Sequence, residues 1–287
     1  MILCSDTYLP ATGEITVMKR WGFLYSVLSL ILLINLYFLL TPALAHVPIF
    51  EGGGQSPEAS IQVEDPEKSQ VLYGQIAAGD LRYYSFDVEK GDRIVLGLIV
   101  PVEQVNAGFT PDLFLMSPGL MNEGEIPKML EIPEGYGVIA YSGNLSQGPV
   151  YEGFTPSAFY SLARADLKAP ESGKYYVAIG STQKEGSYGI VVGYKETFSL
   201  MEWISVPFSQ IKIYQWEGQS LFLIFLPLGA TLAAGLLAIY INRENVTSFT
   251  PARFSGVLAG LFFIGTGMSY IFQMLVSLIK TSYTPEA

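Results

Sequence analysis

Cysteine and histidine are almost absent from the 287-residue sequence, which holds one of each, Cys4 and His46. A single cysteine excludes an intrachain disulfide and a thiolate metal cluster. A single imidazole leaves a Ser-His-Asp or Cys-His hydrolase with one candidate base. The sequence also contains no nucleophile elbow, phosphate-binding loop or zinc-protease motif. We therefore expect a protein without enzymatic activity, and with no cofactor other than the calcium considered below.

Charged residues are also scarce, at 15% of the chain, and their balance is acidic, with a net charge of -10. Without a cluster of Lys and Arg to neutralise phosphates, nucleic acid is not an expected partner. The mean hydropathy of +0.35 is high for an ordinary soluble domain. The excess lies in three uncharged runs, Trp21 to Phe50, Gly218 to Asn242 and Phe254 to Ile279.

The first uncharged run has the order of parts of an export signal. A basic pair at residues 19–20 precedes an apolar stretch from Trp21 to Leu40, and an A-x-A cleavage site ends at Ala45. Residues 1–17 match no part of this pattern, which favours translation from Met18. The alternative to cleavage is an uncleaved signal anchor, because the apolar stretch is longer than most signal sequences. Both alternatives place the following domain outside the cytoplasm.

Two later runs, 220–241 and 254–279, are each long enough to cross a hydrocarbon layer of about 30 Å. The loop 242–253 carries more basic than acidic residues, so the positive-inside rule makes it cytoplasmic and the tail 280–287 external. Neither run contains a charged residue, which disfavours ion or proton conduction by this chain alone. We expect a transmembrane hairpin that serves as an anchor or docking surface, with the lipid bilayer as a partner.

Small residues lie one turn apart within both spans, in the pairs Gly229 and Ala233, and Gly256 and Gly260. Such pairs let helix backbones approach closely, so the two helices are expected to pack on each other through them. The alternative is that glycine and alanine are simply common in membrane helices. The segment 196–219 before the first span is expected to be a juxtamembrane linker.

Three aromatic residues of that linker, Trp203, Tyr214 and Trp216, are expected at the level of the lipid headgroups, which suit amphipathic rings. Asn144 begins an Asn-Leu-Ser sequon. This sequon lies outside the cytoplasm in the expected topology, so Asn144 is a candidate glycosylation site.

The region 70–195 consists of short apolar runs separated by turn signals, which predicts a mainly β domain. Gly79 and Gly91 lie in short turns where a positive φ would close hairpins without strain. Alternation directs Tyr84 and Phe86 into the core. The pattern favours an antiparallel sandwich. The candidate strands are 70–77, 81–88, 93–100, 112–116, 137–141, 158–165, 174–180 and 188–194.

Two neighbouring segments are less regular. Residues 46–69 are rich in Gly, Pro, Ser and acids, which predicts a flexible lead-in to the sandwich. Residues 108–156 form a Pro/Gly-rich insertion with many aromatics, including Tyr136, Tyr141 and Tyr151. These rings suit either a recognition surface or a long loop that packs down onto the sandwich.

Turn glycines and core aromatics of this region form a pattern. Its residues are Tyr73-Gly74-x-Ile76, Gly79-Asp80-x-x-Tyr83-Tyr84-x-Phe86, Pro111-Asp112-Leu113-Phe114-Leu115 and Ser172-Gly173-Lys174-Tyr175-Tyr176-Val177. This pattern resembles the bacterial pre-peptidase C-terminal domain over roughly 71–193, and the insertion at 118–156 departs from it. The resemblance implies a jelly-roll-like β-sandwich that is usually a non-catalytic appendage of secreted enzymes, with surface or substrate binding and sometimes calcium binding.

Candidate metal ligands are few. Asp80, Asp87, Asp92 and Asp112 lie near predicted strand ends, where their carboxylates could gather round calcium. Asp beside Gly in a turn ordinarily bonds its own backbone instead. His46 becomes the amino terminus if cleavage follows Ala45, and its amine and imidazole could chelate copper. A copper brace needs a second histidine, so the alternative is an exposed terminal histidine.

Taken together, these features predict a multi-pass protein of the cell membrane whose β domain is a binding or assembly module outside the cytoplasm. Its partner would be another integral membrane protein or a cell-surface ligand. The alternative is an accessory subunit of a membrane enzyme or transporter complex. A metal-dependent enzyme is a third class, and it would require bound metal and turnover.

Overall fold

The structure is a computed structural model that describes residues 46–145, 147–180, 184–241 and 250–282. The expected signal segment, with Met18 and the cleavage site at Ala45, lies outside the described residues. Most of the loop 242–253 and the tail from residue 283 also lie outside them.

Along the chain the strands are β1 (Val47–Ile49), β2 (Ile61–Gln62), β3 (Gln70–Ile76), β4 (Leu81–Val88), β5 (Arg93–Pro101), β6 (Asp112–Ser117), β7 (Gly137–Tyr141), β8 (Val150–Glu152), β9 (Ser157–Lys168), β10 (Gly173–Gly180) and β11 (Gly186–Val192). The helices are α2 (Val102–Asn106), α3 (Leu200–Trp216), α4 (Leu221–Ile241) and α5 (Pro251–Ser282).

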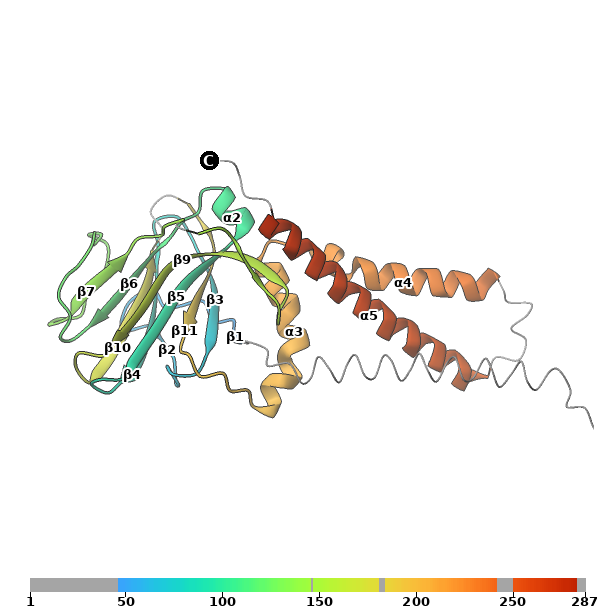
Figure 1. The fold of residues 1–287 in the computed structure, drawn as a ribbon, viewed down its shortest axis with the longest axis horizontal. Coiled ribbons are helices and arrows are strands. Elements are labelled where there is room, and N and C mark those ends of the chain that lie inside the picture. Colours follow the sequence, from blue (N-terminus) through green and yellow to red (C-terminus); the bar gives the residue numbers. More distant parts are fainter. Residues whose placement is uncertain (1–45, 146, 181–183, 242–249, 283–287) are drawn as a thin grey trace, which may run out of the picture. The chain divides into compact units, whose positions relative to one another are not determined.

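The strands form two mixed β-sheets (Figure 1). The first sheet has the order β1-β3-β11-β5-β9-β8 and the second has the order β2-β4-β10-β6-β7. The prediction of a mainly β domain followed by apolar helices is confirmed. The prediction of a purely antiparallel arrangement is wrong, because β1 pairs parallel to β3 and β2 pairs parallel to β4.

The short glycine turns connect the two sheets and do not close hairpins. β3 and β5 belong to the first sheet, whereas β4 between them belongs to the second. Gly79 and Gly91 do adopt positive φ, at 81° and 92°, as expected. A reversal of chain direction needs this conformation whether the next strand pairs with the last one or crosses to the facing sheet. The turn residues alone therefore could not distinguish a hairpin from a crossover.

The core lies between the sheets and contains the apolar faces that alternation predicts. Tyr84 and Phe86 of β4 pack there against alternate residues of β5, β10 and β11. The opposite face of β4 is also buried, because residues of the insertion cover it: Tyr83 packs near Leu130, and its hydroxyl accepts a hydrogen bond of 3.0 Å from the Glu131 amide. This part of the insertion thus packs onto the domain, as one of the two interpretations expected.

Residues 46–69 contribute to both sheets through β1 and β2, which differs from the expected flexible lead-in. Their polar composition is compatible with strands because a two- or three-residue edge strand gains order from the pairing of its backbone with an existing sheet. Residues 196–219 also differ from the expected linker, because most of them form the 17-residue helix α3.

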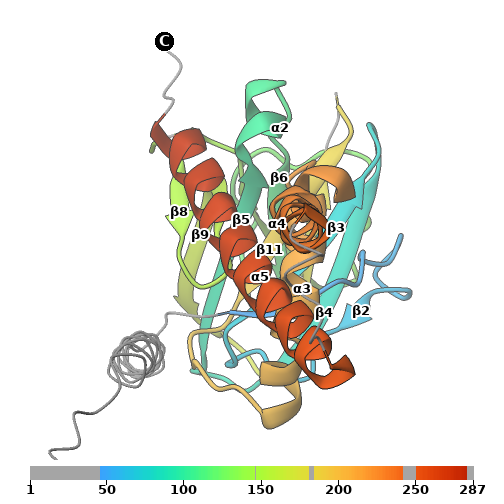
Figure 2. The same ribbon diagram turned by 90° about the vertical axis from the view of Figure 1, so that its right-hand side faces the viewer.

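The long helices α4 and α5 are apolar enough to cross a membrane, and both are mostly exposed within the described chain. α4 is about 31 Å long and α5 about 48 Å long at 1.5 Å per residue. The second half of α5 contacts β8 and β9 (Figure 2), where Tyr270 donates a hydrogen bond of 3.3 Å to the Gly153 carbonyl. The carboxyl-terminal part of the uncharged run 254–279 therefore lies beside the β domain.

Candidate functional site

The contact between the β domain and the helices brings a buried ion pair and a cluster of aromatic side chains together. Its central element is α3, which covers the outer face of the first sheet with its carboxyl-terminal end. Trp216 packs edge-on against Tyr73 of β3 with ring centroids 4.9 Å apart. Its indole nitrogen donates a hydrogen bond of 2.9 Å to the Tyr188 carbonyl of β11, and Ile213 lies in the same cluster. These contacts fix the end of α3 to the sheet.

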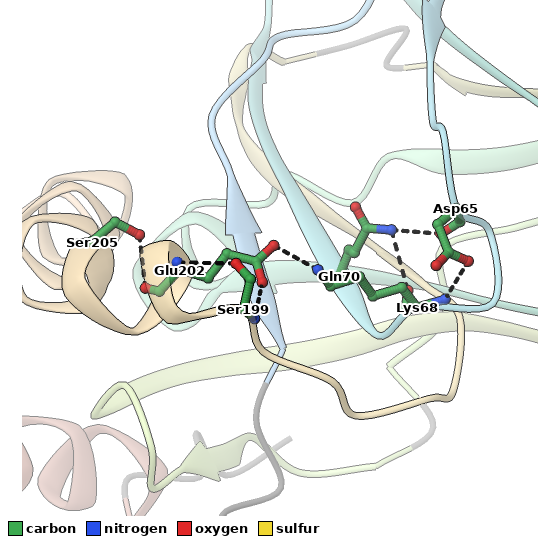
Figure 3. A network of polar contacts seen from close by, with 6 residues as sticks. All are labelled: Asp65, Lys68, Gln70, Ser199, Glu202 and Ser205. Carbon is green, nitrogen blue, oxygen red and sulfur yellow. Dashed lines mark hydrogen bonds and ion pairs between the residues drawn. The ribbon is translucent and has the colours of Figure 1, made fainter.

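The beginning of α3 is fixed to the β domain by polar contacts (Figure 3). Ser199 and Glu202 form a capping box, in which each side chain bonds the other residue's backbone amide. Glu202 also forms an ion pair of 2.6 Å with Lys68, and the Lys68 amide donates to Asp65. Burial opposes ionisation of Glu202, but the hydrogen bonds from Lys68 and Ser199 outweigh it and lower the pKa of the carboxyl.

A buried ion pair lies just beyond the other end of α3. The Glu217 side chain is 0% exposed, and its carboxylate accepts hydrogen bonds from the Ala158 amide at 2.5 Å and from Gln219 at 3.1 Å. Lys280, near the end of α5, lies 3.3 Å from Glu217 and 3.0 Å from Glu103 of α2. One ammonium group therefore links α5 to the residue that follows α3 and to the β domain.

Burial raises the pKa of Glu217, although the charge of Lys280 and the hydrogen bonds from Ala158 and Gln219 act in the opposite direction. A carboxylate without water around it loses solvation that a nearby cation restores only in part. The stability of this contact should therefore depend on pH and on the presence of Lys280.

A cleft of about 700 Å³ opens beside this ion pair. Its walls come from α2, the loop before β11, the connection between α3 and α4, and the end of α5. Glu217, Gln219 and Lys280 line it, and the Gln219 side-chain oxygen is buried without a hydrogen-bond partner among the described residues. The cleft thus has the size of a small-molecule site and carries charges of both signs.

Neither Glu217 nor Lys280 was a candidate in the sequence. A signal for them exists: Glu217 directly precedes the first uncharged C-terminal run and Lys280 directly follows the second. In a two-helix hairpin these two positions lie on the same side, so opposite charges there are natural neighbours. The burial of the pair, however, requires the β domain that covers it.

The four aspartates proposed for calcium do not come together. Asp80 pairs with Arg82 at 3.3 Å, and Asp112 accepts from the Gly143 amide at 2.9 Å. Asp87 accepts from Gln62 at 2.9 Å, and Asp92 accepts from the Glu89 amide at 2.8 Å. Asp80 directly precedes β4, and Asp87 lies seven residues later, near the other end of that strand. Among the residues described, no three acidic, histidine or cysteine side chains are grouped to hold a metal. Each of the four carboxylates is instead engaged with a neighbouring side chain or backbone amide.

His46 is not the exposed histidine of the alternative interpretation. Its ring nitrogen Nδ1 lies 2.5 Å from the Ser69 hydroxyl, and the side chain is partly buried beside β1. Burial lowers the pKa of His46, and Glu196 opposes this shift. The described chain supplies no second imidazole, because the sequence has none.

The predicted helix-packing residues do not form the contact between α4 and α5. A Cβ added at Gly229, Gly256 or Gly260 would meet no described atom within 4 Å. The close approach occurs at other glycines: a Cβ at Gly235 would lie 2.3 Å from Leu261, and one at Gly265 would lie 2.6 Å from a side-chain atom of Leu228. Ala233, one turn after Gly229, is exposed.

Two of the three proposed headgroup aromatics are buried in protein. Tyr214 and Trp216 are each 5% exposed, so they contact the β domain, whereas Trp203 is 49% exposed. Asn144 is exposed in the loop between β7 and β8, as a glycosylation site requires, although Ser146 of its sequon lies outside the described residues.

No protein-family model matches the sequence, and the curated proteins contain no significant match. Solved structures give a distant similarity to β-sandwich domains. PliG from Salmonella Typhimurium, a periplasmic inhibitor of g-type lysozyme, is 18% identical with a TM-score of 0.26, covering 47% of this chain and 99% of PliG. The pre-peptidase C-terminal domain of a Bacillus anthracis collagenase is 15% identical with a TM-score of 0.25, covering 45% of this chain and 90% of that domain.

A third similar structure is CorA of Methylomicrobium album BG8, a surface-associated copper-binding protein. It is 10% identical with a TM-score of 0.25, covering 52% of this chain and all of CorA. All three similarities are distant. They carry no argument about binding or activity.

Proposed function

We propose that the chain is a membrane-anchored binding or assembly module outside the cytoplasm, with a non-catalytic, jelly-roll-like β domain of the pre-peptidase C-terminal kind. The observation that supports this proposal best is the contact between α5 and the β domain. Lys280 at the end of an apolar helix pairs with the buried Glu217 and with Glu103. A helix that passes from lipid onto the domain holds the domain in a fixed position against the membrane.

Such a fixed connection holds the β domain in one orientation, so that one surface of the domain always faces a partner in the same membrane. A domain on a flexible tether samples many orientations, and binding to a partner in the same membrane then costs orientational entropy. The contacts at both ends of α3 reduce that freedom, because Lys68 pairs with Glu202 at one end and Trp216 packs on the sheet at the other. The cleft beside Lys280 is the natural candidate for the binding surface.

The test uses accessibility of a single thiol, because a folded β domain resists proteases whichever side it occupies. Cys4 is replaced by Ser, and Met121, which is 85% exposed between β6 and β7, is replaced by Cys. In intact cells a membrane-impermeant maleimide should label this thiol fully, and the chain should resist alkaline extraction from membranes. Labelling of Met121→Cys only after lysis would overturn the proposed topology, and release by alkali would overturn the anchor.

An accessory subunit of a membrane enzyme or transporter complex is the second candidate. It is favoured by the open space at Gly229, Gly256 and Gly260, where small residues face away from described atoms. Small residues of this kind allow close approach of another helix. Mild detergent extraction followed by affinity isolation should then recover an integral-membrane partner at stoichiometric amounts, and Gly256→Leu should lose it. Recovery of a monomer without a partner would exclude this second candidate.

A further inference from the structure

The amino-terminal half of α3 presents large apolar side chains outward, which is the reverse of an ordinary surface helix, whereas apolar residues at its carboxyl-terminal end pack on the β domain. Leu200, Met201, Ile204 and Phe208 are between 57% and 76% exposed. Leu200, Ile204 and Phe208 follow one another at intervals of four, so they form one stripe along the helix. Large apolar side chains in a contiguous stripe cost free energy in water, and soluble proteins rarely leave such a surface uncovered.

The side of α3 that faces the β domain is the one that carries its acidic residue. Glu202 turns toward Lys68 and is held by it (Figure 3). The other charged residue of the helix, Lys212, lies 5.0 Å from the centre of the Phe50 ring. Both charges of α3 are therefore engaged with the domain, and the outward stripe is entirely uncharged. A simple rotation that would bury the stripe would break the contacts at both ends of the helix.

The position of α3 identifies what covers this stripe. Four residues, 217–220, separate its end from the start of α4, and the two helices are in contact. In Figures 1 and 2 α3 runs across the direction of α4 and α5 at the point where they meet the β domain. An apolar stripe in this position continues the exposed apolar surface of the hairpin. A helix that crosses the foot of a membrane hairpin lies in the plane of the interface.

Aromatic side chains extend the same surface. Trp203 is half exposed and packs against Phe154 and Phe198, with ring centroids 5.7 and 5.2 Å away. Tryptophan at the edge of an apolar helix face suits the boundary between headgroups and acyl chains, where its ring is in apolar surroundings and its N–H reaches water.

We propose that α3 is an interfacial helix whose stripe of Leu200, Met201, Ile204 and Phe208 inserts into the outer boundary of the bilayer. This inference rests on the proposed membrane anchor and deepens it. It makes α3, after α4 and α5, a third helix in contact with lipid, and this contact orients the β domain. Since the stripe is uncharged, insertion takes place in zwitterionic lipid and does not depend on anionic headgroups or on salt.

The test compares three single-cysteine variants of the full chain in the Cys4→Ser background, reconstituted in phosphatidylcholine vesicles and labelled with an environment-sensitive fluorophore. Phe208→Cys probes the stripe. Phe222→Cys, at an exposed position of α4, is the control for lipid, and Met121→Cys is the control for water. Spin-labelled lipids quench each fluorophore from a shallow position, near the glycerol backbone, or from a deep one, near the bilayer centre.

The expected result is that the label at Phe208 is quenched roughly twice as strongly by the shallow spin label as by the deep one. The label at Met121 should not respond. If the label at Phe222 is quenched while the label at Phe208 remains accessible to iodide in water, the anchor stands and the interfacial helix is refuted. If the label at Phe208 is shielded from both iodide and lipid, protein covers the stripe, and the proposal is also refuted. If the label at Phe222 is not quenched, the anchor itself fails.

Discussion

Replacement of Lys280 by methionine tests the buried ion pair directly. Methionine keeps an unbranched apolar side chain of similar length but removes the ammonium group that lies 3.3 Å from Glu217. The Glu217 side chain is 0% exposed and that of Lys280 only 13% exposed, so water does not simply replace the lost partner. The remaining contacts of Glu217 are hydrogen bonds from the Ala158 amide and from Gln219.

Removal of one partner from a buried ion pair costs about 3–5 kcal/mol, because an unpaired charge stays in a poorly solvated position. The two hydrogen bonds that Glu217 keeps place the expected loss near the lower end, at about 3 kcal/mol. For a folded unit of this size such a loss lowers the midpoint of thermal unfolding by about 6–12 °C.

The loss should depend on pH in a defined direction. The pKa of Glu217 in the folded chain is already raised above its ordinary value of 4.5 by burial, and loss of Lys280 raises it further. Between the unfolded and the folded pKa the folded chain binds more protons, so stability falls as pH rises through this window. The Lys280→Met variant should therefore approach the wild-type midpoint when the pH is lowered and Glu217 becomes neutral.

The assay is intrinsic-fluorescence thermal unfolding of the full chain in detergent, at a series of pH values on both sides of neutrality. Glu217→Gln and the double variant Glu217→Gln/Lys280→Met are the matched controls, because glutamine keeps an acceptor for Ala158 without the charge. The double variant should be more stable than Lys280→Met alone and lack its pH dependence. A Lys280→Met midpoint equal to wild type at neutral pH, or additive losses in the double variant, would refute the reasoning.

Three further predictions concern individual contacts. Gly91 has a φ of 92°, and an added Cβ there would meet nothing within 4 Å. Gly91→Val should therefore lower the free energy of unfolding by about 1–3 kcal/mol through backbone strain alone, and Gly91→Asn should lower it less. Equal unfolding midpoints for the two variants would contradict this prediction. Gly235→Leu should destabilise the contact of α4 with Leu261 by about 1–3 kcal/mol, whereas Gly256→Leu should not change the unfolding midpoint of the monomer in detergent. A larger loss of midpoint for Gly256→Leu than for Gly235→Leu would mean that the two helices pack through other residues. Trp216→Phe removes the donor to a buried backbone carbonyl and should cost about 1–3 kcal/mol in denaturant unfolding; an unchanged midpoint would mean that the bond contributes nothing.

Much of the β domain could be predicted because the relevant signals are local. Alternation of apolar residues located β4 and β7 at the residues where the structure has them, and it directed Tyr84 and Phe86 into the core. The steric cost of a positive φ singled out Gly79 and Gly91. The length of an uncharged run likewise indicated two apolar helices at the carboxyl-terminal end. Each of these properties depends on residues within a few positions of one another.

The sheet to which each strand belongs was decided only in three dimensions. The same turn at Gly91 serves a hairpin or a crossover, and the choice depends on distant partners: β4 pairs with β10, and β5 pairs with β9 and β11. The short strands β1 and β2 exist because neighbouring strands offer them unpaired backbone groups. Residues without a strong propensity of their own take such structure from their surroundings.

The candidate site depended most on tertiary structure. A sequence cannot distinguish an apolar residue that faces lipid from one that faces protein, since both environments select the same side chains. Trp216 is therefore buried on the β domain, and the second half of α5 contacts that domain, where the sequence had indicated membrane. The stripe that includes Phe208 is exposed where the sequence had indicated a linker. The charges of Glu217 and Lys280 at the two ends of the hairpin were visible in the sequence. Only the fold buries Glu217, and this burial is what makes loss of either partner costly in free energy.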